Sequence, residues 1–318
     1  MPQTTRALIV QSRGLIGLET VEVPAAAPDE ATVQVKAISL NRGEVKRALT
    51  LAEPGWRPGW DISGVVSEAA ADGSGPKPGT RVVGVLPAGA WAEFVRVPSS
   101  QLAVLPESVS FAQAATLPVA GLTALLALRK GGLLLGHKVL VDGASGGVGL
   151  YAVQLAAAAG AIVYAHVRKH EQAALVAPYC NGGVIVAPTL EGAKASGPFH
   201  LIVDSIGGSA LGAALSMLTR SGVCVTFGIS ESVTCTFNSA EFFRATGTSL
   251  HGIMMFDEIR RGESATDGLG ILLHLLEQGE LNPQIEIEAP WSDAQSIAEQ
   301  LMARAYTGKA VLHVQAQS

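Results

Sequence analysis

Apolar and polar residues follow two different patterns along the chain, and the change falls near residue 110. Before it, short stretches alternate between apolar and polar positions and are separated by Gly and Pro, which is typical of half-buried β-strands. Such closely spaced strands predict a small barrel or sandwich. The expected strands are residues 6–11, 32–39, 64–66, 81–86 and 90–97, while 41–51 are expected to form a short helix or turn and 54–61 to be irregular.

After residue 110, short apolar strands alternate with segments of helical composition. This order predicts an α/β fold, a doubly wound parallel sheet that binds ligands at the carboxyl ends of its strands. The expected strands are residues 139–141, 162–167, 184–186, 201–204, 223–227, 249–254 and 310–314. The expected helices are residues 111–117, 122–129, 170–177, 209–218, 269–277 and 293–306, besides a long alanine-rich helix that ends at Gly160.

A glycine-rich turn joins the strand at 139–141 to that alanine-rich helix, and two interpretations of the turn compete. As Ala144-x-Gly146-x-x-Gly149 it is a dinucleotide fingerprint whose first glycine has become alanine. As Gly143-x-Ser145-x-Gly147 it is a nucleophile elbow that carries a hydrolytic serine. Both need a strand, a turn and a helix, so the turn alone does not decide between them.

A hydrolase also needs an acid and then a histidine downstream of the serine, and Asp204 and His251 supply that order. No oxyanion segment precedes the turn, however, and the elbow gives Gly149 no role. In the dinucleotide interpretation Gly149 lets the helix pack closely on the sheet and Gly146 lets the backbone approach a pyrophosphate. The free N–H groups of the helix N-terminus then bind that phosphate. The dinucleotide interpretation is therefore favoured, with a serine esterase using Ser145 as the alternative.

Composition narrows the function classes further. A chain of 318 residues predicts two domains, and a net charge of −5 gives no support for nucleic-acid binding. Three cysteines without CxxC spacing indicate a reducing compartment and argue against a disulfide framework or a zinc knuckle. There is no leader-like start and no long uninterrupted apolar run. We expect a soluble, cytoplasmic protein without membrane association.

Eight short motifs occur in order along most of the chain: Asn41, Pro58-Gly59-x-x-x-x-Gly64-Val65-Val66, Gly79-Thr80-Arg81-Val82, Gly89-Ala90-Trp91-Ala92-Glu93, Ala114-Ala115-x-x-Pro118-x-x-Gly121-Leu122-Thr123-Ala124, Gly146-Gly147-Val148-Gly149, Asp204-Ser205-Ile206-Gly207-Gly208 and Phe227-Gly228. Together with the order of the domains, these motifs resemble the medium-chain dehydrogenase/reductase superfamily, and within it the zinc-free quinone oxidoreductase (zeta-crystallin-like) branch. The resemblance implies a Rossmann domain at residues 113–255 and a β-rich, GroES-like barrel domain at 1–112 and 256–318. It also implies a homodimer, with residues 249–254 as the strand that pairs across the twofold axis.

The resemblance implies a nicotinamide cofactor, and the end of the second strand favours NADPH. NAD enzymes usually place an acid there to bind the ribose hydroxyls, whereas this strand ends in Arg168 and Lys169. An arginine can bind a 2′-phosphate with two parallel hydrogen bonds. In the family a lysine and a tyrosine share this phosphate; Lys169 matches the lysine, but Ala187 stands near the place of the tyrosine. The other cofactor-binding residues implied by the resemblance are Asn41, Thr123, Ser145, Gly146, Gly147, Val148, Ser205, Ile206, Phe227 and Gly228.

No metal site is predicted. The zinc alcohol dehydrogenases of this superfamily have a Gly-His-Glu motif where this chain has Gly59-Trp60-Asp61, and no cysteine occurs before Cys180. Without a Lewis acid, alcohol oxidation is not expected. The expected reaction is hydride transfer from NADPH to a quinone or to an α,β-unsaturated carbonyl (enone or enoyl) acceptor. A cofactor-binding protein without enzyme activity is a further alternative.

Two residues are candidates for the catalytic site. Asn41 is expected to form hydrogen bonds beside the nicotinamide. The relatives have a tyrosine after or near this asparagine, whereas this chain has Arg42 and no tyrosine before Tyr151. Arg42 can stabilise a developing enolate, but it is a poor acid because a guanidinium does not give up its proton in proteins. Pairing with Glu44 or contact with solvent is the alternative role.

Overall fold

The computed structural model describes residues 4–315 and divides into two compact units. One unit, which we call the discontinuous unit, consists of Met1–Leu122 and Gly262–Ser318. The other, the continuous unit, is Thr123–Arg261. Helix α3 (Pro118–Arg129) contains the boundary between them. The predicted functional division at residues 112/113 and 255/256 stays a prediction.

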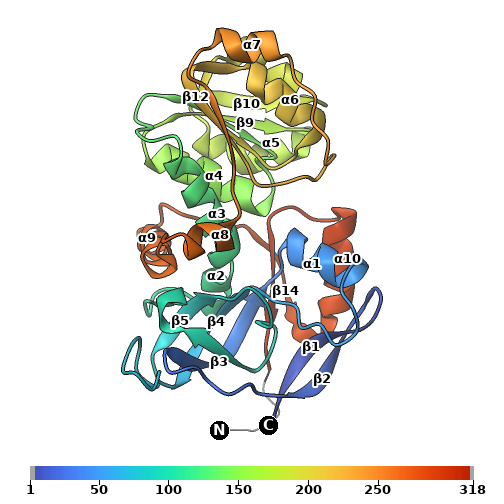
Figure 1. The fold of residues 1–318 in the computed structure, drawn as a ribbon, viewed down its shortest axis with the longest axis vertical. Helices are drawn as coiled ribbons and strands as arrows, with labels where there is room; N and C mark the ends of the chain where they lie inside the picture. Colours follow the sequence, from blue (N-terminus) through green and yellow to red (C-terminus); the bar gives the residue numbers. More distant parts are fainter. Residues whose placement is uncertain (1–3, 316–318) are drawn as a thin grey trace. The chain divides into compact units, whose positions relative to one another are not determined.

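The discontinuous unit is built on a seven-stranded sheet with the order β14-β15-β3-β4-β5-β7, in which β6 also pairs with β3 (Figure 1). Strands β1 and β2, the first two in the sequence, form a separate two-stranded antiparallel sheet. The strands are β1 (Thr4–Ser12), β2 (Leu15–Glu22), β3 (Glu30–Ser39), β4 (Asp61–Glu68), β5 (Arg81–Val85), β6 (Phe94–Pro98), β7 (Leu102–Val104), β14 (Ile285–Pro290) and β15 (Lys309–His313). The helices are α1 (Arg42–Thr50), α2 (Phe111–Ala115), α9 (Ala265–Glu277) and α10 (Ala294–Ala303).

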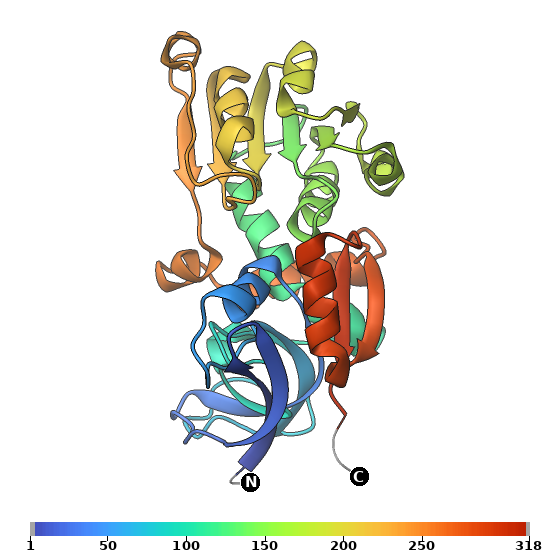
Figure 2. The same ribbon diagram turned by 90° about the vertical axis from the view of Figure 1, so that its right-hand side faces the viewer.

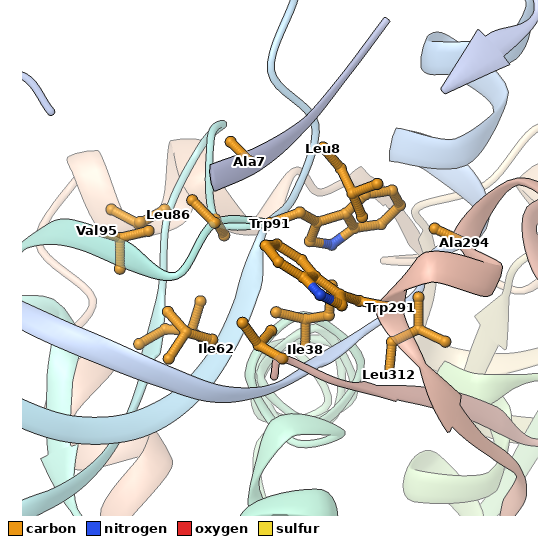
Figure 3. Close-up of a cluster of buried hydrophobic side chains, with 14 of the residues drawn as sticks. Ala7, Leu8, Ile38, Ile62, Leu86, Trp91, Val95, Trp291, Ala294 and Leu312 are labelled. Atoms are coloured by element: carbon orange, nitrogen blue, oxygen red, sulfur yellow. The ribbon is translucent and has the colours of Figure 1, made fainter. Parts of the chain in front are cut away.

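The core of this unit joins segments from both ends of the chain. Trp91, completely buried, and Trp291, 3% exposed, lie close together with Ile38, Ile62 and Leu312 around them (Figure 3). The C-terminal strand β15 lies between β14 and β3, and it pairs with β3 in antiparallel register. Helices α1 and α10 pack against each other, although about 250 residues separate them in the sequence (Figure 1). Helix α10 and strand β15 thus complete the unit that the first part of the chain begins.

The continuous unit contains a six-stranded, entirely parallel sheet with the order β10-β9-β8-β11-β12-β13. Figure 2 shows these strands side by side, with β13 in orange at one edge. The strands are β8 (Lys138–Asp142), β9 (Ile162–Val167), β10 (Gly183–Val186), β11 (Phe199–Asp204), β12 (Leu218–Thr226) and β13 (Ser249–Gly252). The helices are α4 (Gly147–Ala158), α5 (His170–Val176), α6 (Gly208–Ser216), α7 (Ser239–Arg244) and α8 (Met255–Arg260). This order is the predicted doubly wound α/β fold, with its topological switch point between β8 and β11.

Several boundaries differ from the sequence-based prediction. Residues 90–93 are not part of strand β6, which begins only at Phe94. The N–H groups of Ala90 and Trp91 bond to the loop carbonyls of Gly59 and Pro58, and the Glu93 N–H bonds to the Arg6 carbonyl in β1. Asp61, placed in the irregular segment, is the first residue of β4. Leu218, placed in a helix, opens β12. The elements that were not predicted are β2, β7, β14, α7 and α8.

No helix within residues 4–315 is both long and apolar enough to cross a lipid bilayer.

Candidate functional site

The glycine-rich turn lies at the switch point of the parallel sheet, between the end of β8 and the start of α4. Gly146 is the N-cap of α4, and Gly143 accepts the Gly146 N–H through its carbonyl at 3.0 Å. A Cβ at Gly149 would lie 2.4 Å from the carbonyl oxygen of Gly143 and 2.7 Å from Cα of Ala144. Only glycine therefore lets the first turn of the helix pack this closely on the turn. The first N–H groups of α4 point out of the helix without an intrahelical acceptor, as at every helix start.

The loops after β11 and β12 meet the glycine-rich turn after β8. A Cβ at Gly143 would lie 2.4 Å from Oγ of Ser205, in the loop after β11, and a Cβ at Gly228, after β12, would lie 2.2 Å from the carbonyl oxygen of Ser205. Ser205 also donates its hydroxyl to the carbonyl oxygen of Asp142 at 3.1 Å. The structure thus brings the predicted cofactor residues Ser145–Val148, Ser205, Ile206, Phe227 and Gly228 to the carboxyl ends of neighbouring strands.

Asp204, the last residue of β11, holds the loop that follows it. Its Oδ1 accepts the backbone N–H groups of Ile206 and Gly207 at 3.0 and 3.1 Å, and its Oδ2 accepts the Thr226 hydroxyl at 2.7 Å. Burial raises the pKa of Asp204, and these hydrogen bonds oppose that increase. The Ile206 N–H is therefore used inside the loop, and the Ile206 carbonyl accepts the Glu231 N–H at 2.9 Å. The side chain of Ile206 is left for other contacts.

The proposed hydrolytic triad does not form. In the parallel register His251 is level with Val225 and Val203, whereas Asp204 is level with Thr226. Adjacent residues of a strand point to opposite faces of the sheet, so His251 and Asp204 lie on opposite faces. Asp204 is also fully occupied by the loop after β11. The esterase interpretation of Ser145 is therefore wrong in its geometry.

The two cations predicted to bind a 2′-phosphate lie at the exposed end of β9. Arg168 and Lys169 are both exposed, and Lys169 Nζ lies 3.2 Å from Oε1 of Glu171 in the first turn of α5. Exposed ion pairs of this kind contribute little stability and are readily exchanged for another anion. Ala187 lies near the expected place of the family's tyrosine, and its carbonyl oxygen is 3.0 Å from Nε2 of His166.

A cavity of about 390 Å³ opens at the carboxyl ends of β12 and β13. Phe227 and Gly228, which were predicted to contact the cofactor, line it together with Met254. Glu258, which is 7% exposed, also lines the cavity. Its Oε2 forms an ion pair with Lys130 Nζ at 2.6 Å. Thr123, the remaining predicted cofactor residue of this unit, is buried on α3 with 7% exposure.

In the discontinuous unit, Asn41 is the centre of a buried polar network that the sequence did not reveal. Its Oδ1 accepts Lys309 Nζ at 2.7 Å, and its Nδ2 donates to Asp61 Oδ2 at 2.7 Å and to Glu44 Oε1 at 3.0 Å. Lys309 Nζ also donates to the Leu40 carbonyl at 3.1 Å and lies 3.7 Å from Asp61 Oδ2. Both amide hydrogens of Asn41 are thus used within the unit, and one lone pair on Oδ1 is left for a ligand. The role of Asn41 beside a nicotinamide stays a prediction.

The three ionisable members of this network have shifted pKa values. Burial, followed by the charge of Asp61, raises the pKa of Glu44 well above its ordinary value. Burial also raises the pKa of Asp61, although Lys309 opposes this, and burial lowers the pKa of Lys309. Groups that resist ionisation in this way are expensive to bury, and they persist because each has hydrogen-bonding partners. The one exception is Glu44 Oε2, which is buried without a hydrogen-bond partner.

Arg42 has a structural partner. Its guanidinium donates to the carbonyl oxygens of Leu301 and Met302 at 3.1 and 3.4 Å, in the last turn of α10. A cation at this position complements the negative end of the helix dipole. The expected alternative, a pair between Arg42 and Glu44, does not form, because Glu44 faces Asn41. The catalytic role of Arg42 stays a prediction beside this capping role.

The position of the zinc motif is occupied by the same network. Asp61 accepts the Val119 backbone N–H at 2.9 Å, accepts Asn41, and lies beside the Lys309 ammonium. Trp60 donates its indole N–H to the Pro87 carbonyl at 3.0 Å. Among residues 4–315 no group of three or more His, Cys, Asp or Glu side chains is placed to hold a metal ion. The Asp61 carboxylate is already bound to N–H donors and an ammonium, and the Trp60 indole is no metal ligand, so these residues do not fit a zinc ion.

Comparison with family models supports both halves of this description. Residues 27–107 match the alcohol dehydrogenase GroES-like domain, and residues 147–267 match the domain described as zinc-binding dehydrogenase. A chloroplast envelope quinone oxidoreductase homolog of Arabidopsis thaliana is 41% identical over 170 residues, which are 48% of this chain and 51% of that protein. The human synaptic vesicle membrane protein VAT-1 homolog is 26% identical over 91% of this chain and 80% of its own length.

Other relatives are much longer proteins. The chain is 36% identical over 207 residues to a spectinabilin polyketide synthase protein of Streptomyces orinoci, and the match covers 64% of this chain but 10% of that protein. It likewise spans 15% of a mycocerosic acid synthase-like polyketide synthase of Mycobacterium tuberculosis.

Solved structures share the fold over nearly the whole chain. The quinone oxidoreductase of Coxiella burnetii superposes with a TM-score of 0.82 at 24% identity, over 98% of this chain and 100% of the other. The enoyl reductase CurK superposes with a TM-score of 0.85 at 21% identity, again over 98% and 100%.

Proposed function

Because the chain belongs to the medium-chain dehydrogenase/reductase superfamily, in its quinone oxidoreductase (zeta-crystallin-like) branch, we propose that it is an NADPH-dependent oxidoreductase. The acceptor class is a quinone or an α,β-unsaturated carbonyl, and no zinc takes part. The observation that carries the proposal is the glycine-rich turn at the switch point, with Gly149 in a position that excludes a Cβ and the N-terminus of α4 directed outward. A predicted cytoplasmic location accompanies the proposal.

The residues of the continuous unit fit such a cofactor. The first N–H groups of α4 and the hydroxyl of Ser145 would hold the pyrophosphate, as helix N-termini do. Arg168 and Lys169 would hold the adenosine 2′-phosphate through charge-assisted hydrogen bonds. The cavity beside Phe227 and Gly228 would receive part of the nicotinamide half. When bound, NADPH supplies the hydride that reduces the conjugated acceptor.

The discontinuous unit would contribute position rather than acid–base chemistry. Lys309 and Asp61 fix both ends of the Asn41 amide, so its remaining Oδ1 lone pair has one orientation. Fixed donors and acceptors lower the reorganisation needed at the moment of reaction. The chain has no tyrosine before Tyr151, and Arg42 is a poor acid, so the proton that follows the hydride would come from solvent.

Nucleotide binding is the first test. Saturating NADPH should raise the melting temperature, and NADH should raise it less, because ligands that bind only the folded state stabilise it by mass action. NADPH consumption at 340 nm, followed across a panel of quinones and enones, then identifies the acceptor. Turnover should survive exhaustive dialysis against a chelator.

The outcomes separate the alternatives. No thermal shift from either nucleotide would contradict the cofactor assignment. Binding of NADPH without turnover of any quinone or enone would instead favour a non-enzymatic, cofactor-binding role. Loss of turnover on chelation would contradict zinc independence.

A further inference from the structure

A buried aspartate–histidine pair lies at the carboxyl ends of β8 and β9, and the proposed reaction does not use it. Nδ1 of His166 lies 2.7 Å from Oδ1 of Asp142, and the two residues are directly opposite in the parallel register. His166 is 4% exposed and Asp142 2% exposed. The other ring nitrogen, Nε2, lies 3.0 Å from the carbonyl oxygen of Ala187, just after β10.

Both ring nitrogens therefore face oxygen atoms, and each contact needs a hydrogen. The Ala187 carbonyl can only accept, so Nε2 of His166 donates to it. The contact between Nδ1 and Oδ1 then holds one further proton between the two side chains. The ring is fixed at both nitrogens, which sets its orientation and the direction of the strand end that carries it.

The pair connects the loops of the proposed cofactor site. The carbonyl oxygen of His166 accepts the Ala144 N–H at 3.2 Å, inside the glycine-rich turn. The carbonyl oxygen of Asp142 accepts the Ser205 hydroxyl at 3.1 Å. The Ala187 N–H donates to the Val167 carbonyl at 3.1 Å. Arg168 and Lys169 follow His166 by two and three residues, so the pair holds the base of the segment that carries both cations.

Packing alone does not explain these two side chains. Apolar residues could fill the positions of Asp142 and His166, as Val163 and Ala165 do earlier in β9, without the cost of burying polar groups. The second oxygen of Asp142, Oδ2, is buried and lacks a hydrogen-bond partner, which adds to that cost. Polar groups held at such expense commonly serve a geometric purpose at a functional site.

We propose that Asp142 and His166 are positioning residues for cofactor discrimination. They hold the end of β9 so that Arg168 and Lys169 meet the adenosine 2′-phosphate, and thereby favour NADPH over NADH. The inference rests on the proposed function, because it requires that this unit binds a nicotinamide nucleotide.

Two substitutions of the same histidine separate its two contacts. In His166→Asn the side-chain amide can occupy the place of Nδ1 and keep the bond to Asp142. In His166→Gln it can occupy the place of Nε2 and keep only the bond to Ala187. Dissociation constants are measured for NADPH and NADH, and for the fragments 2′,5′-ADP and 5′-AMP, which probe the adenosine end alone.

His166→Gln should weaken the binding of NADPH and 2′,5′-ADP about tenfold, and the binding of NADH and 5′-AMP less than about twofold. A tenfold change corresponds to about 1.4 kcal/mol, the scale of one charge-assisted hydrogen bond. His166→Asn should keep NADPH within about threefold of the original chain. A matched control is His200→Gln, because His200 Nε2 also contacts a backbone carbonyl, that of Gly131 at 2.8 Å, but at the amino end of β11. His200→Gln should leave the ratio of the NADPH and NADH constants unchanged. Melting temperatures of all variants show which of them fold.

A double-mutant cycle tests whether the pair acts through the cations. In an Arg168→Ala, Lys169→Ala background, His166→Gln should no longer change the ratio of NADPH to NADH affinity. Equal weakening of both nucleotides by His166→Gln, or no change in either, would overturn the inference while leaving the proposed cofactor intact. If the original chain bound neither nucleotide nor fragment, the proposed function would fall and the inference with it.

Discussion

At the scale of single residues, Glu44 shows how burial sets a charge state. Its raised pKa means that the folded state favours the protonated form. The stability contributed by that form is complete below the ordinary glutamate pKa of 4.5 and is lost as the pH rises through the folded-state pKa. A neutral side chain of the same shape should avoid this loss.

Glu44→Gln should therefore be increasingly more stable than the original chain as the pH rises from 4.5. The difference in the free energy of unfolding should grow by about 1.4 kcal/mol per pH unit while Glu44 is ionised only in the unfolded chain. The glutamine carbonyl can still accept both Asn41 N–H groups. Urea denaturation across this range measures the effect, with the exposed Glu53→Gln as a control. Parallel pH profiles for Glu44→Gln and the original chain would show that Glu44 is ionised in the folded state.

Gly149 makes a second prediction at this scale. A methyl group there would overlap backbone atoms of Gly143 and Ala144, which cannot move without opening the turn. Gly149→Ala should cost about 1–3 kcal/mol of stability and abolish nucleotide binding. Gly270→Ala is a matched control in α9, where an added Cβ meets nothing within 4 Å; it should stabilise the protein by about 0.5–1 kcal/mol. Undiminished NADPH binding by Gly149→Ala would show that the turn relaxes.

At the scale of elements, helix α10 depends on a side chain from far away in the sequence. Arg42→Met removes two hydrogen bonds to its last carbonyls, at Leu301 and Met302, and should lower the free energy of unfolding by about 1–2 kcal/mol. Arg42→Lys keeps the cation near the helix end and should recover part of that loss. Denaturant titration compares the three chains. Equal stability of all three would mean that solvent replaces the arginine at no cost.

The strands predicted from the sequence were mainly those whose buried residues form an unbroken apolar run or alternate regularly with polar residues. β8, β9 and β11 belong to this class, since each is buried on both faces. β14 was missed although its sequence Ile-Glu-Ile-Glu-Ala-Pro also alternates, and none of its residues is fully buried at this edge of the sheet. The short helix α8 was missed because only Met255 and Glu258 are buried along it.

The candidate site divides in the same way. The glycine-rich turn is local, so its residues could be named before the fold was known. The Asn41 network joins positions 41, 44, 61 and 309, and no spacing in the sequence indicates such contacts. The one available signal was Lys309, a charged residue directly before the apolar run Ala310–Leu312 of its strand. Asp142 and His166 lie on neighbouring strands 24 positions apart, and no local pattern in the sequence indicates that they pair.

At the scale of the whole molecule, the free edge of β13 bears on assembly. β13 pairs with β12 on one side, and no strand within residues 4–315 pairs with its other side. Leu250, on this strand, is 44% exposed, and Phe243, on α7, is 82% exposed. Apolar side chains beside an open sheet edge favour pairing with a second copy of the chain. The predicted homodimer would use this edge.

Leu250→Lys should then weaken the dimer at least about tenfold, because a buried, unpaired lysine costs more than the lost leucine contact. Light scattering after gel filtration, over a range of protein concentrations, gives the mass. Leu133→Lys replaces a leucine that is 72% exposed away from this edge and should leave the mass unchanged. A monomeric original chain would contradict the homodimer, and an unaffected Leu250→Lys dimer would place the interface elsewhere.

The position of β15 between β14 and β3 also has a consequence for biosynthesis. The continuous unit can form as soon as Thr123–Arg261 has left the ribosome, because all its strands come from one stretch of chain. In the discontinuous unit β6 covers one edge of β3 along Glu30–Gln34, but the part of that edge at Ala37–Ser39 stays unpaired until Lys309–His313 has been made. Exposed edges of this kind are where nascent chains aggregate. The synthesis of β15 thus determines how long this part of β3 needs protection.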